Sequence, residues 1–303
     1  MKRDTRHVPV LLDQLLSAID LRPGQVVVDC TLGLGGHAAA MLRCVGPSGR
    51  LIGVDFDPSN IELARGRLRD VGGRFDLYHN NFAALPTVLN QAGAERVDAI
   101  VADLGVASPQ IDDPGRGFSY RRAGPLDMRM DPTRGQPASA LIARIPEREL
   151  AEALLELGDE TDARRIAQLI VERRRIDPIT TTQALMAIVC EARDFTLKRA
   201  AGAKLHPAAR TFQALRILVN RELANLDRLL AVIPQCLKPG GTAAIISFHS
   251  GEDRRVKSSF RQGRDNGIYE AISPDPIVAS LAEQKVNPRS RSAKLRWARN
   301  KQV

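Results

Sequence analysis

Short apolar runs alternate with amphipathic segments over the first third of the chain. The β-rich apolar runs, which predict strands, are Val26–Cys30, Arg50–Val54, Phe75–His79 and Val97–Ala102. Segments with helical periodicity lie between them, at Ala38–Val45, Pro58–Val71 and Ala83–Gln91. Strands that alternate with helices build parallel sheets with right-handed crossovers. The pattern therefore predicts an α/β fold with a doubly wound, parallel-type, Rossmann-like sheet.

The pattern changes after about residue 112. Residues 112–135 are rich in Gly, Pro, Asp and Arg, and helical patterns follow at 149–157, 163–175 and 181–192. One long helix is predicted over Thr211–Leu237, and a buried strand over Gly241–Phe248. Because the strand pattern resumes there, we predict one sheet domain, 1–112 and 210–303, interrupted by a mostly helical insert at 113–209.

A glycine-rich loop follows the first predicted strand, with the sequence Asp29-Cys30-Thr31-Leu32-Gly33-Leu34-Gly35-Gly36-His37-Ala38. Glycines let the backbone approach a ligand closely, and the next helix presents its first N–H groups to it. Asp55 ends the second predicted strand, 20 positions after Gly35, where a carboxylate can bind a ribose diol. This spacing fits both NAD and S-adenosylmethionine. Asp29 favours the methyl donor, because a carboxylate suits its cationic amine and repels a pyrophosphate.

A third aspartate, Asp103, follows the fourth predicted strand. Ligands of open α/β sheets bind beyond the carboxyl ends of the strands. We therefore expect Asp29, Asp55 and Asp103 to converge on one crevice, with Asp103 as a candidate for contact with the reacting group.

Longer motifs in a fixed order carry a resemblance to a known family. They include His7–Leu12, Gly35–His37, Asp55–Pro58, Asp103–Gln110, Arg116–Ser119, Gly124–Asp131, His206–Pro207, Arg210–Arg216, Ser247–Ser250, Glu252–Arg254 and Asn287–Arg296. Through them the sequence resembles, nearly end to end, the bacterial ribosomal RNA small-subunit methyltransferase H family. That family uses S-adenosylmethionine to methylate N4 of a cytidine in 16S ribosomal RNA.

The resemblance implies the same activity here, with 16S ribosomal RNA of the small subunit as partner and S-adenosylmethionine as methyl donor. It also implies which residues line the donor pocket: Gly35, Gly36, His37, Asp55, Phe82, Asp103 and Gln110. For the transfer itself we expect Asp103, or backbone carbonyls of the Ala107-Ser108-Pro109 turn, to accept an N–H of the target amine. The stretch Ser108-Pro109-Gln110 loosely resembles the Ser-Pro-Pro-Tyr turn of DNA amino-methyltransferases.

The sequence departs from the family at a few positions. The family usually has Ser where Ala107 stands, Thr where Ala209 stands and Leu where Gly251 stands. It also tends to have a lysine-rich stretch where this chain has residues 272–277. These departures affect substrate contacts and local stability rather than the reaction class.

Composition narrows the class of protein. The chain has 303 residues and four cysteines without a CxxC pair, which favours a reduced, cytoplasmic protein with no metal site. No apolar run is long enough for a membrane span.

The net charge of +9 favours a polyanionic partner. Two basic stretches are candidates for phosphate contacts: Arg254, Arg255, Lys257, Arg261 and Arg264, and then Lys285, Arg289, Arg291, Lys294, Arg296, Arg299 and Lys301.

Two other function classes stay open at this point. An NAD-dependent oxidoreductase would need a catalytic His or Tyr pair in the crevice, and the few Tyr and His residues offer no obvious one. A non-catalytic RNA-binding protein could keep the pocket without turnover.

Overall fold

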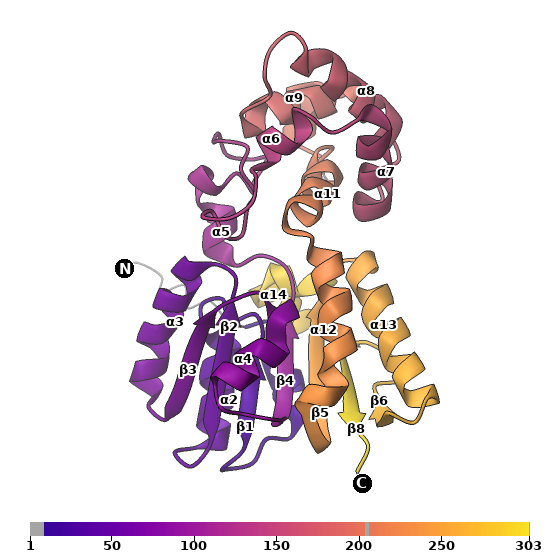
Figure 1. The fold of residues 1–303 in the computed structure, drawn as a ribbon. Helices are drawn as coiled ribbons and strands as arrows, with labels where there is room; N and C mark the ends of the chain where they lie inside the picture. The colour runs from indigo at the N-terminus through magenta and orange to yellow at the C-terminus, as the bar shows by residue number, and fades with distance from the viewer. Residues whose placement is uncertain (1–8, 204–205, 303) are drawn as a thin grey trace. The chain divides into compact units, whose positions relative to one another are not determined.

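The chain forms two compact units. The computed structural model describes residues 9–203 and 206–302, so His7 and Val8 of the first motif lie outside the described residues. A sheet unit consists of Met1–Gly105 with Leu223–Val303, and a helical unit of Val106–Glu222 (Figure 1). The helical unit thus begins before residue 113 and ends after residue 209, the bounds that the sequence predicts for the insert.

The central sheet has the strand order β3-β2-β1-β4-β5-β8-β6, with β7 also pairing with β8. Its first five strands in sequence run parallel. They are β1 (Val26–Asp29), β2 (Arg50–Asp55), β3 (Arg74–His79), β4 (Val97–Asp103) and β5 (Leu237–Ser247). The chain reverses its direction of strand addition between β1 and β4, so their carboxyl ends form the usual ligand-binding edge of such sheets. The predicted doubly wound sheet is confirmed.

Three further strands extend the sheet beyond β5: β8 runs antiparallel to β5, and β6 and β7 each pair antiparallel with β8. They are β6 (Tyr269–Ile272), β7 (Ile277–Val278) and β8 (Lys294–Asn300), and β8 lies between β5 and β6. They are not predicted from the sequence, because the lysine and two arginines of residues 294–300 hide the apolar alternation that marks a strand. Leu295 and Ala298 are nevertheless fully buried.

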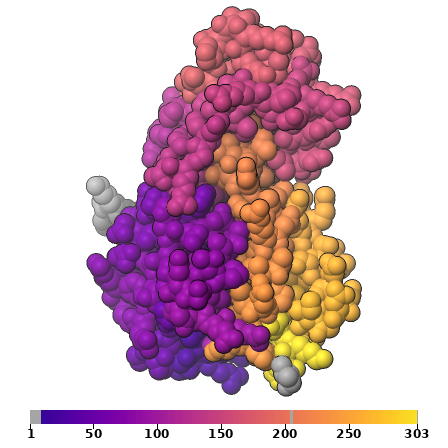
Figure 2. All heavy atoms as spheres, viewed as in Figure 1, coloured from indigo at the N-terminus to yellow at the C-terminus, as the bar shows by residue number. Residues whose placement is uncertain are grey.

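Helices cover both faces of the sheet. One face packs on α1 (Leu12–Ile19), α2 (Gly36–Val45) and α3 (Pro58–Val71). The other packs on α4 (Leu85–Gln91), α12 (Glu222–Cys236) and α13 (Ser250–Asp265). The space-filling view shows α4 and α12 side by side over the sheet (Figure 2). The remaining elements of this unit are η1 (Phe82–Ala84), α14 (Leu281–Val286) and η3 (Pro288–Ser292).

Strand residues alternate between the two faces. Val28 and Ile52 belong to the core under α4 and α12. Their sequence neighbours Val27 and Leu51 belong to the core under α1, α2 and α3. Both faces are apolar because both are covered, as is typical of parallel sheets.

The helical unit has its own apolar core, which includes Leu150, Ile166, Val189 and Phe212. Its elements are α5 (Ser108–Asp112), η2 (Pro114–Arg116), α6 (Ala138–Ile142), α7 (Glu147–Gly158), α8 (Ala163–Arg174), α9 (Thr182–Ala192), α10 (Leu197–Ala201) and α11 (Ala209–Asn220). Across residues 9–203 and 206–302, no helix is long and apolar enough to cross a membrane.

The long helix predicted over Thr211–Leu237 is wrong, because two helices occupy this stretch. Helix α11 ends at Arg221, whose φ of 51° and ψ of 38° are left-handed. One left-handed residue ends the α-helical hydrogen-bond ladder without changing the apolar pattern, so the break is invisible to periodicity. The end of α11 is fixed by Asn220, whose amide donates to the carbonyl of Met128 at 2.8 Å. Helix α11 therefore packs with the helical unit, and α12 with the sheet unit.

Candidate active site

Acidic residues meet at the carboxyl ends of neighbouring parallel strands, as predicted. Asp29 ends β1, Asp55 ends β2 and Asp103 ends β4. Asp29 and Asp55 are 1% and 8% exposed, so both carboxyl groups lie below the surface. Asp29 interacts electrostatically with His37, Asp103 and Asp55. The structure therefore brings these four side chains together at one edge of the sheet.

The glycine loop turns sharply between β1 and α2. Gly35 stands at the N-cap of α2 with a φ of +72°, a left-handed conformation that favours glycine. A Cβ atom there would lie 3.1 Å from the Cβ of Ala64 in α3. Glycine at this position therefore allows α3 to pack against the loop while α2 begins directly beside the strand ends.

Asp55 anchors the loop to the second strand. Its Oδ2 accepts a hydrogen bond from the Gly33 N–H at 2.7 Å. Its Oδ1 accepts from the Asp57 N–H at 2.8 Å and from the Asn60 amide at 3.2 Å. Burial raises the pKa of Asp55, and these hydrogen bonds oppose that rise. A carboxylate has about four acceptor positions, so a hydroxyl group of a ligand can still bind at Oδ2.

His37 points one ring nitrogen at a carbonyl and the other at Asp103. Its Nε2 lies 2.9 Å from the Val10 carbonyl oxygen, which can only accept, so Nε2 carries the proton. Its Nδ1 lies 3.6 Å from Oδ2 of Asp103. Burial lowers the pKa of His37, while Asp29 and the Val10 hydrogen bond oppose that effect. A neutral imidazole therefore faces Asp103.

Asp103 has a carboxyl oxygen without a donor. Its backbone N–H donates to Thr31 Oγ1 at 2.6 Å, which fixes the end of β4. Its Oδ1 is enclosed and has no hydrogen-bond partner among the described residues, although a quarter of the side chain is exposed. Burial, followed by the charge of Glu252, raises the pKa of Asp103 to about 7. Buried acceptors are normally paired, so this oxygen fits an N–H group of a bound molecule.

Asp29 lies deeper than Asp103 in the same edge. Its Oδ1 accepts from the Thr31 N–H at 3.1 Å. Burial raises its pKa to about 6, although His37 opposes the rise. Near neutral pH a carboxyl group of this kind supplies a negative charge for a cationic ligand amine.

Phe82 begins η1 shortly after β3 and is half-buried against the core under α4. The Asn81 side chain caps this turn by accepting from the Ala83 N–H at 2.8 Å. The ring therefore both packs in the core and keeps an exposed part for contact with a ligand.

The other predicted site residues belong to the helical unit. Ser108 and Pro109 begin α5, and Gln110, the next residue, is buried. The Gln110 side-chain oxygen accepts from the Ala107 N–H at 2.8 Å, so part of its amide is used inside the turn. Ala107 itself stands at the N-cap and offers no side-chain cap.

The sequence analysis does not single out Glu252 and His249, two residues near Asp103, as functional. Glu252 is 2% exposed and influences Asp103, and His249 contacts Glu252. Both lie inside motifs of the family resemblance, Ser247–Ser250 and Glu252–Arg254, which is the one signal that points to them.

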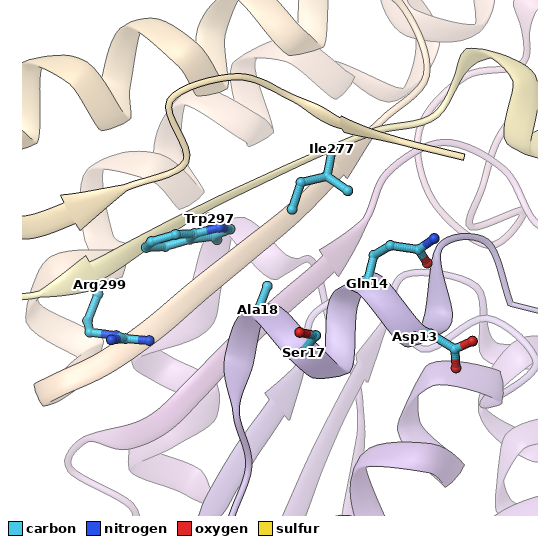
Figure 3. Close-up of a pocket in the computed structure, with 7 residues that line it drawn as sticks. All are labelled: Asp13, Gln14, Ser17, Ala18, Ile277, Trp297 and Arg299. Carbon is cyan, nitrogen blue, oxygen red and sulfur yellow. The ribbon is translucent and has the colours of Figure 1, made fainter. Parts of the chain in front are cut away.

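A groove of about 490 Å³ lies elsewhere on the sheet unit, between α1 and the strands β7 and β8. None of the residues predicted for the donor pocket or the methyl transfer lines this groove, although Arg299 of the second basic stretch does. The residues that line the groove are Asp13, Gln14, Ser17, Ala18, Ile277, Trp297 and Arg299 (Figure 3).

Within the described part of the chain, no group of three or more His, Cys, Asp or Glu side chains is arranged to hold a metal ion.

Comparisons with known proteins show the family to which the chain belongs. The chain matches the MraW methylase family over residues 4–301. Proteins named ribosomal RNA small subunit methyltransferase H are similar to it: that of Acidobacterium capsulatum is 42% identical, over 99% of this chain and 100% of its own length. That of Halorhodospira halophila is 46% identical, over 97% of this chain and 94% of its own length. A solved rRNA methylase structure from Streptococcus thermophilus, 12% identical, covers 96% of this chain and 94% of its own with a TM-score of 0.43, too distant to add support. On the family match and these relatives, the chain belongs to the MraW methylase family.

Proposed function

We propose that this protein transfers a methyl group from S-adenosylmethionine to N4 of a cytidine in 16S ribosomal RNA of the small ribosomal subunit, in the cytoplasm. The observation that carries the proposal is the enclosed Oδ1 of Asp103 beside the glycine loop, which has no hydrogen-bond partner within residues 9–203 and 206–302. Family membership fixes the reaction class as methyl transfer, and the relatives' names point to ribosomal RNA as the substrate.

Residues at the strand ends fit the parts of the donor. When bound, S-adenosylmethionine supplies a methyl group on a cationic sulfur. Asp29 and His37 suit its charged amino-acid end, and Asp55 suits a ribose hydroxyl through Oδ2. The glycine loop at Gly35 leaves room for a close backbone approach, and Phe82 offers an apolar ring for the adenine.

The target amine is a weak nucleophile, because its lone pair is delocalised into the cytosine ring. The protein must therefore hold N4 in line with the breaking bond, at about 3–3.5 Å from the methyl carbon. The N4 lone pair forms the new N–C bond while the electrons of the S–C bond pass to sulfur. N4 then releases one proton, which the Asp103 carboxylate accepts. Its pKa of about 7 suits a proton acceptor that works near neutral pH.

The sequence also names backbone carbonyls of the Ala107-Ser108-Pro109 turn for this contact. The Ala107 carbonyl already accepts from the N–H groups of Gln110 and Ile111, at 3.1 and 3.4 Å, so we assign the contact to Asp103.

Basic residues on α13 fit an RNA partner. Arg254, Lys257 and Arg261 are spaced i, i+3, i+7 and so share one side of the helix. The structure gives these three no acidic partner among the described residues. By contrast, Arg255 pairs with Asp227 at 3.2 Å. We call Arg254, Lys257 and Arg261 the α13 stripe and propose that it contacts RNA phosphates.

The test is methyl transfer from labelled S-adenosylmethionine to small ribosomal subunits that lack the modification. Nucleoside mass spectrometry of the recovered RNA should show label in N4-methylcytidine. Asp103→Asn should lower turnover at saturating donor by about 100-fold or more, while Asp227→Asn, which removes an exposed carboxylate, should not.

Two results would overturn the proposal. Label in a nucleoside other than N4-methylcytidine would show that the proposed target nucleotide is wrong. A protein that binds no S-adenosylmethionine in calorimetry would remove the methyl-transfer proposal altogether.

A further inference from the structure

Residues 9–11 lie directly against the start of α2, where the glycine loop ends. A Cβ atom at Gly36 would come within 2.6 Å of the Pro9 side chain, so glycine at this position lets the two segments meet. The Val10 carbonyl oxygen lies 2.9 Å from His37 Nε2. The placement of this short segment therefore decides which ring nitrogen of His37 carries the proton.

Leu11 holds a backbone conformation that is rare for a residue with a side chain. Its φ of 53° and ψ of 35° are left-handed, and it stands at the N-cap of α1. Its side chain is fully buried in the core under α1, α2 and α3, to which Val10 also belongs. Such a conformation persists only where the surrounding structure holds it in place.

Glu283 of α14 binds the backbone of Leu11. Its Oε1 accepts a hydrogen bond from the Leu11 N–H at 2.8 Å, across 272 positions of the sequence. The stretch Ser280-Leu281-Ala282-Glu283 has the spacing of a capping box, in which the glutamate turns back to the start of its own helix. The serine half is present, because Ser280 Oγ accepts from the Glu283 N–H at 3.2 Å. The Glu283 carboxylate, however, reaches Leu11, so this side chain joins α14 to the turn before α1.

We propose that Glu283 is a positioning residue for the methyl donor: it holds the Leu11 turn so that the Val10 carbonyl keeps His37 protonated at Nε2. The inference rests on the proposed function, in which His37 meets the charged amino-acid end of the donor. With the proton on Nε2, His37 Nδ1 carries a lone pair that can accept from the ammonium group of the donor. The opposite tautomer would present an N–H group to that cation and repel it.

Helix α14 has further anchors besides this contact. Ala279 and Ala293, which flank α14 and η3, are buried in the same core as Leu11. Within this segment, Gln284 Nε2 donates to the Ala279 carbonyl at 2.9 Å. Loss of the Glu283 carboxylate should therefore remove the hydrogen bond at Leu11 while the core contacts keep α14 in place. Gln284, the next residue of the same helix, offers a matched control.

The first test measures donor affinity by calorimetry in the full chain, with S-adenosylmethionine as the probe. Glu283→Ala should weaken binding by about 10-fold, because it removes one hydrogen bond at the Leu11 turn. Glu283→Gln should restore the affinity to within about threefold, since its amide oxygen can still accept from the Leu11 N–H. Gln284→Ala should bind the donor as the unchanged protein does. Equal affinities in Glu283→Ala and the unchanged protein would overturn the proposal.

The second test reads the His37 tautomer in the free protein, by ¹⁵N NMR of the histidine rings at about pH 8, where a neutral ring prevails. The His37 signals are assigned with His37→Gln. The ring should carry its proton on Nε2 in the unchanged protein, in Glu283→Gln and in Gln284→Ala, and should exchange between both tautomers in Glu283→Ala. A ring that keeps its proton on Nε2 alone in Glu283→Ala would refute the positioning role.

This second readout separates the inference from the function on which it rests. A loss of overall stability would not by itself change the His37 tautomer in the folded protein. An unchanged protein that binds no S-adenosylmethionine would remove the proposed function, whereas the tautomer tests the Glu283 contact without donor or RNA.

Discussion

At the residue scale, the site consists of carboxyl groups that the fold holds away from water. Asp29 and Asp103 have pKa values raised to about 6 and about 7, in both cases mainly by burial. Such groups destabilise the free protein when they ionise, because water would solvate them better. In the proposed function, a bound cation or N–H group uses this charge.

Asp103→Asn should therefore stabilise the free protein at high pH. The folded-state pKa of Asp103 lies above its ordinary value, so the folded state binds the proton more tightly and loses stability as pH rises from about 4 to about 7. Above that window the variant should be more stable by on the order of 4 kcal/mol, and below it the two proteins should converge. Chemical denaturation at pH 5 and pH 8 measures this; a gain of equal size at both would contradict it.

Sequence alone predicts part of this site. Asp29, Asp55 and Asp103 follow apolar runs, and the carboxyl ends of parallel strands share one edge, so their convergence follows from pattern. Glu252 cannot be found this way, because its effect depends on a helix cap that brings β5 and α13 beside β4. Which residues of two neighbouring strands lie opposite each other depends on the strand register. The hydrophobic periodicity of the sequence does not predict that register.

At the element scale, the same limit explains the wrong long helix and the missed strands. The parallel strands β1 to β5 follow from apolar runs, whereas the break at Arg221 depends on a single backbone conformation. Strand β8 carries buried Arg296, which the charge of Asp253 makes possible. In a sequence, a charged residue such as Arg296 predicts a surface position, because the acidic partner that allows its burial is known only from the structure.

Arg221→Gly should stabilise the protein. A left-handed φ of 51° costs a residue with a side chain about 1 kcal/mol or more, and glycine adopts it freely. After the entropy cost of glycine, we expect a gain of about 0.5–1 kcal/mol. Arg221→Ala removes the same exposed guanidinium but keeps the Cβ, so it serves as control. Thermal unfolding followed by circular dichroism should separate the two; equal midpoints would mean that the left-handed turn is unstrained.

Arg296 and Arg291 lie in one basic stretch but should behave differently. Arg296 is 5% exposed and bound to Asp253, so Arg296→Ala leaves this largely buried carboxylate without its closest partner and should cost about 3 kcal/mol. Arg291 is exposed, and Arg291→Ala should change stability by less than about 0.5 kcal/mol. Urea denaturation of both variants checks this, and similar midpoints would contradict the structural role of Arg296.

At the scale of the whole molecule, the basic residues behind the net charge of +9 differ in whether an acidic side chain pairs with them. Many arginines of the helical unit are paired with acids, including Arg148 with Glu152 and Arg173 with Glu191. The α13 stripe on the sheet unit has no such pairs among the described residues. Unpaired positive charge is what releases counterions when RNA binds.

Replacement of the α13 stripe by glutamine should weaken RNA binding and flatten its salt dependence. Each phosphate contact contributes about 0.7–0.9 to the slope of log affinity against log salt, so the slope should fall by about 2–3. The control replaces three arginines that already have acidic partners, Arg148, Arg165 and Arg173. Filter binding of a 16S RNA fragment from low to moderate salt measures both. A slope that changes equally in stripe and control would show that the stripe has no special contact with RNA.

Strand β8 also has a consequence for the order in which the protein is made. It fills the place between β5 and β6, yet its residues 294–300 leave the ribosome after every other strand of the sheet. Strand β6 therefore cannot pair with β8 until β8 has been synthesised. The edge of β5 likewise stays unpaired until residue 300 has emerged. A nascent chain stalled before residue 294 should expose an open sheet edge at β5 until this last strand emerges.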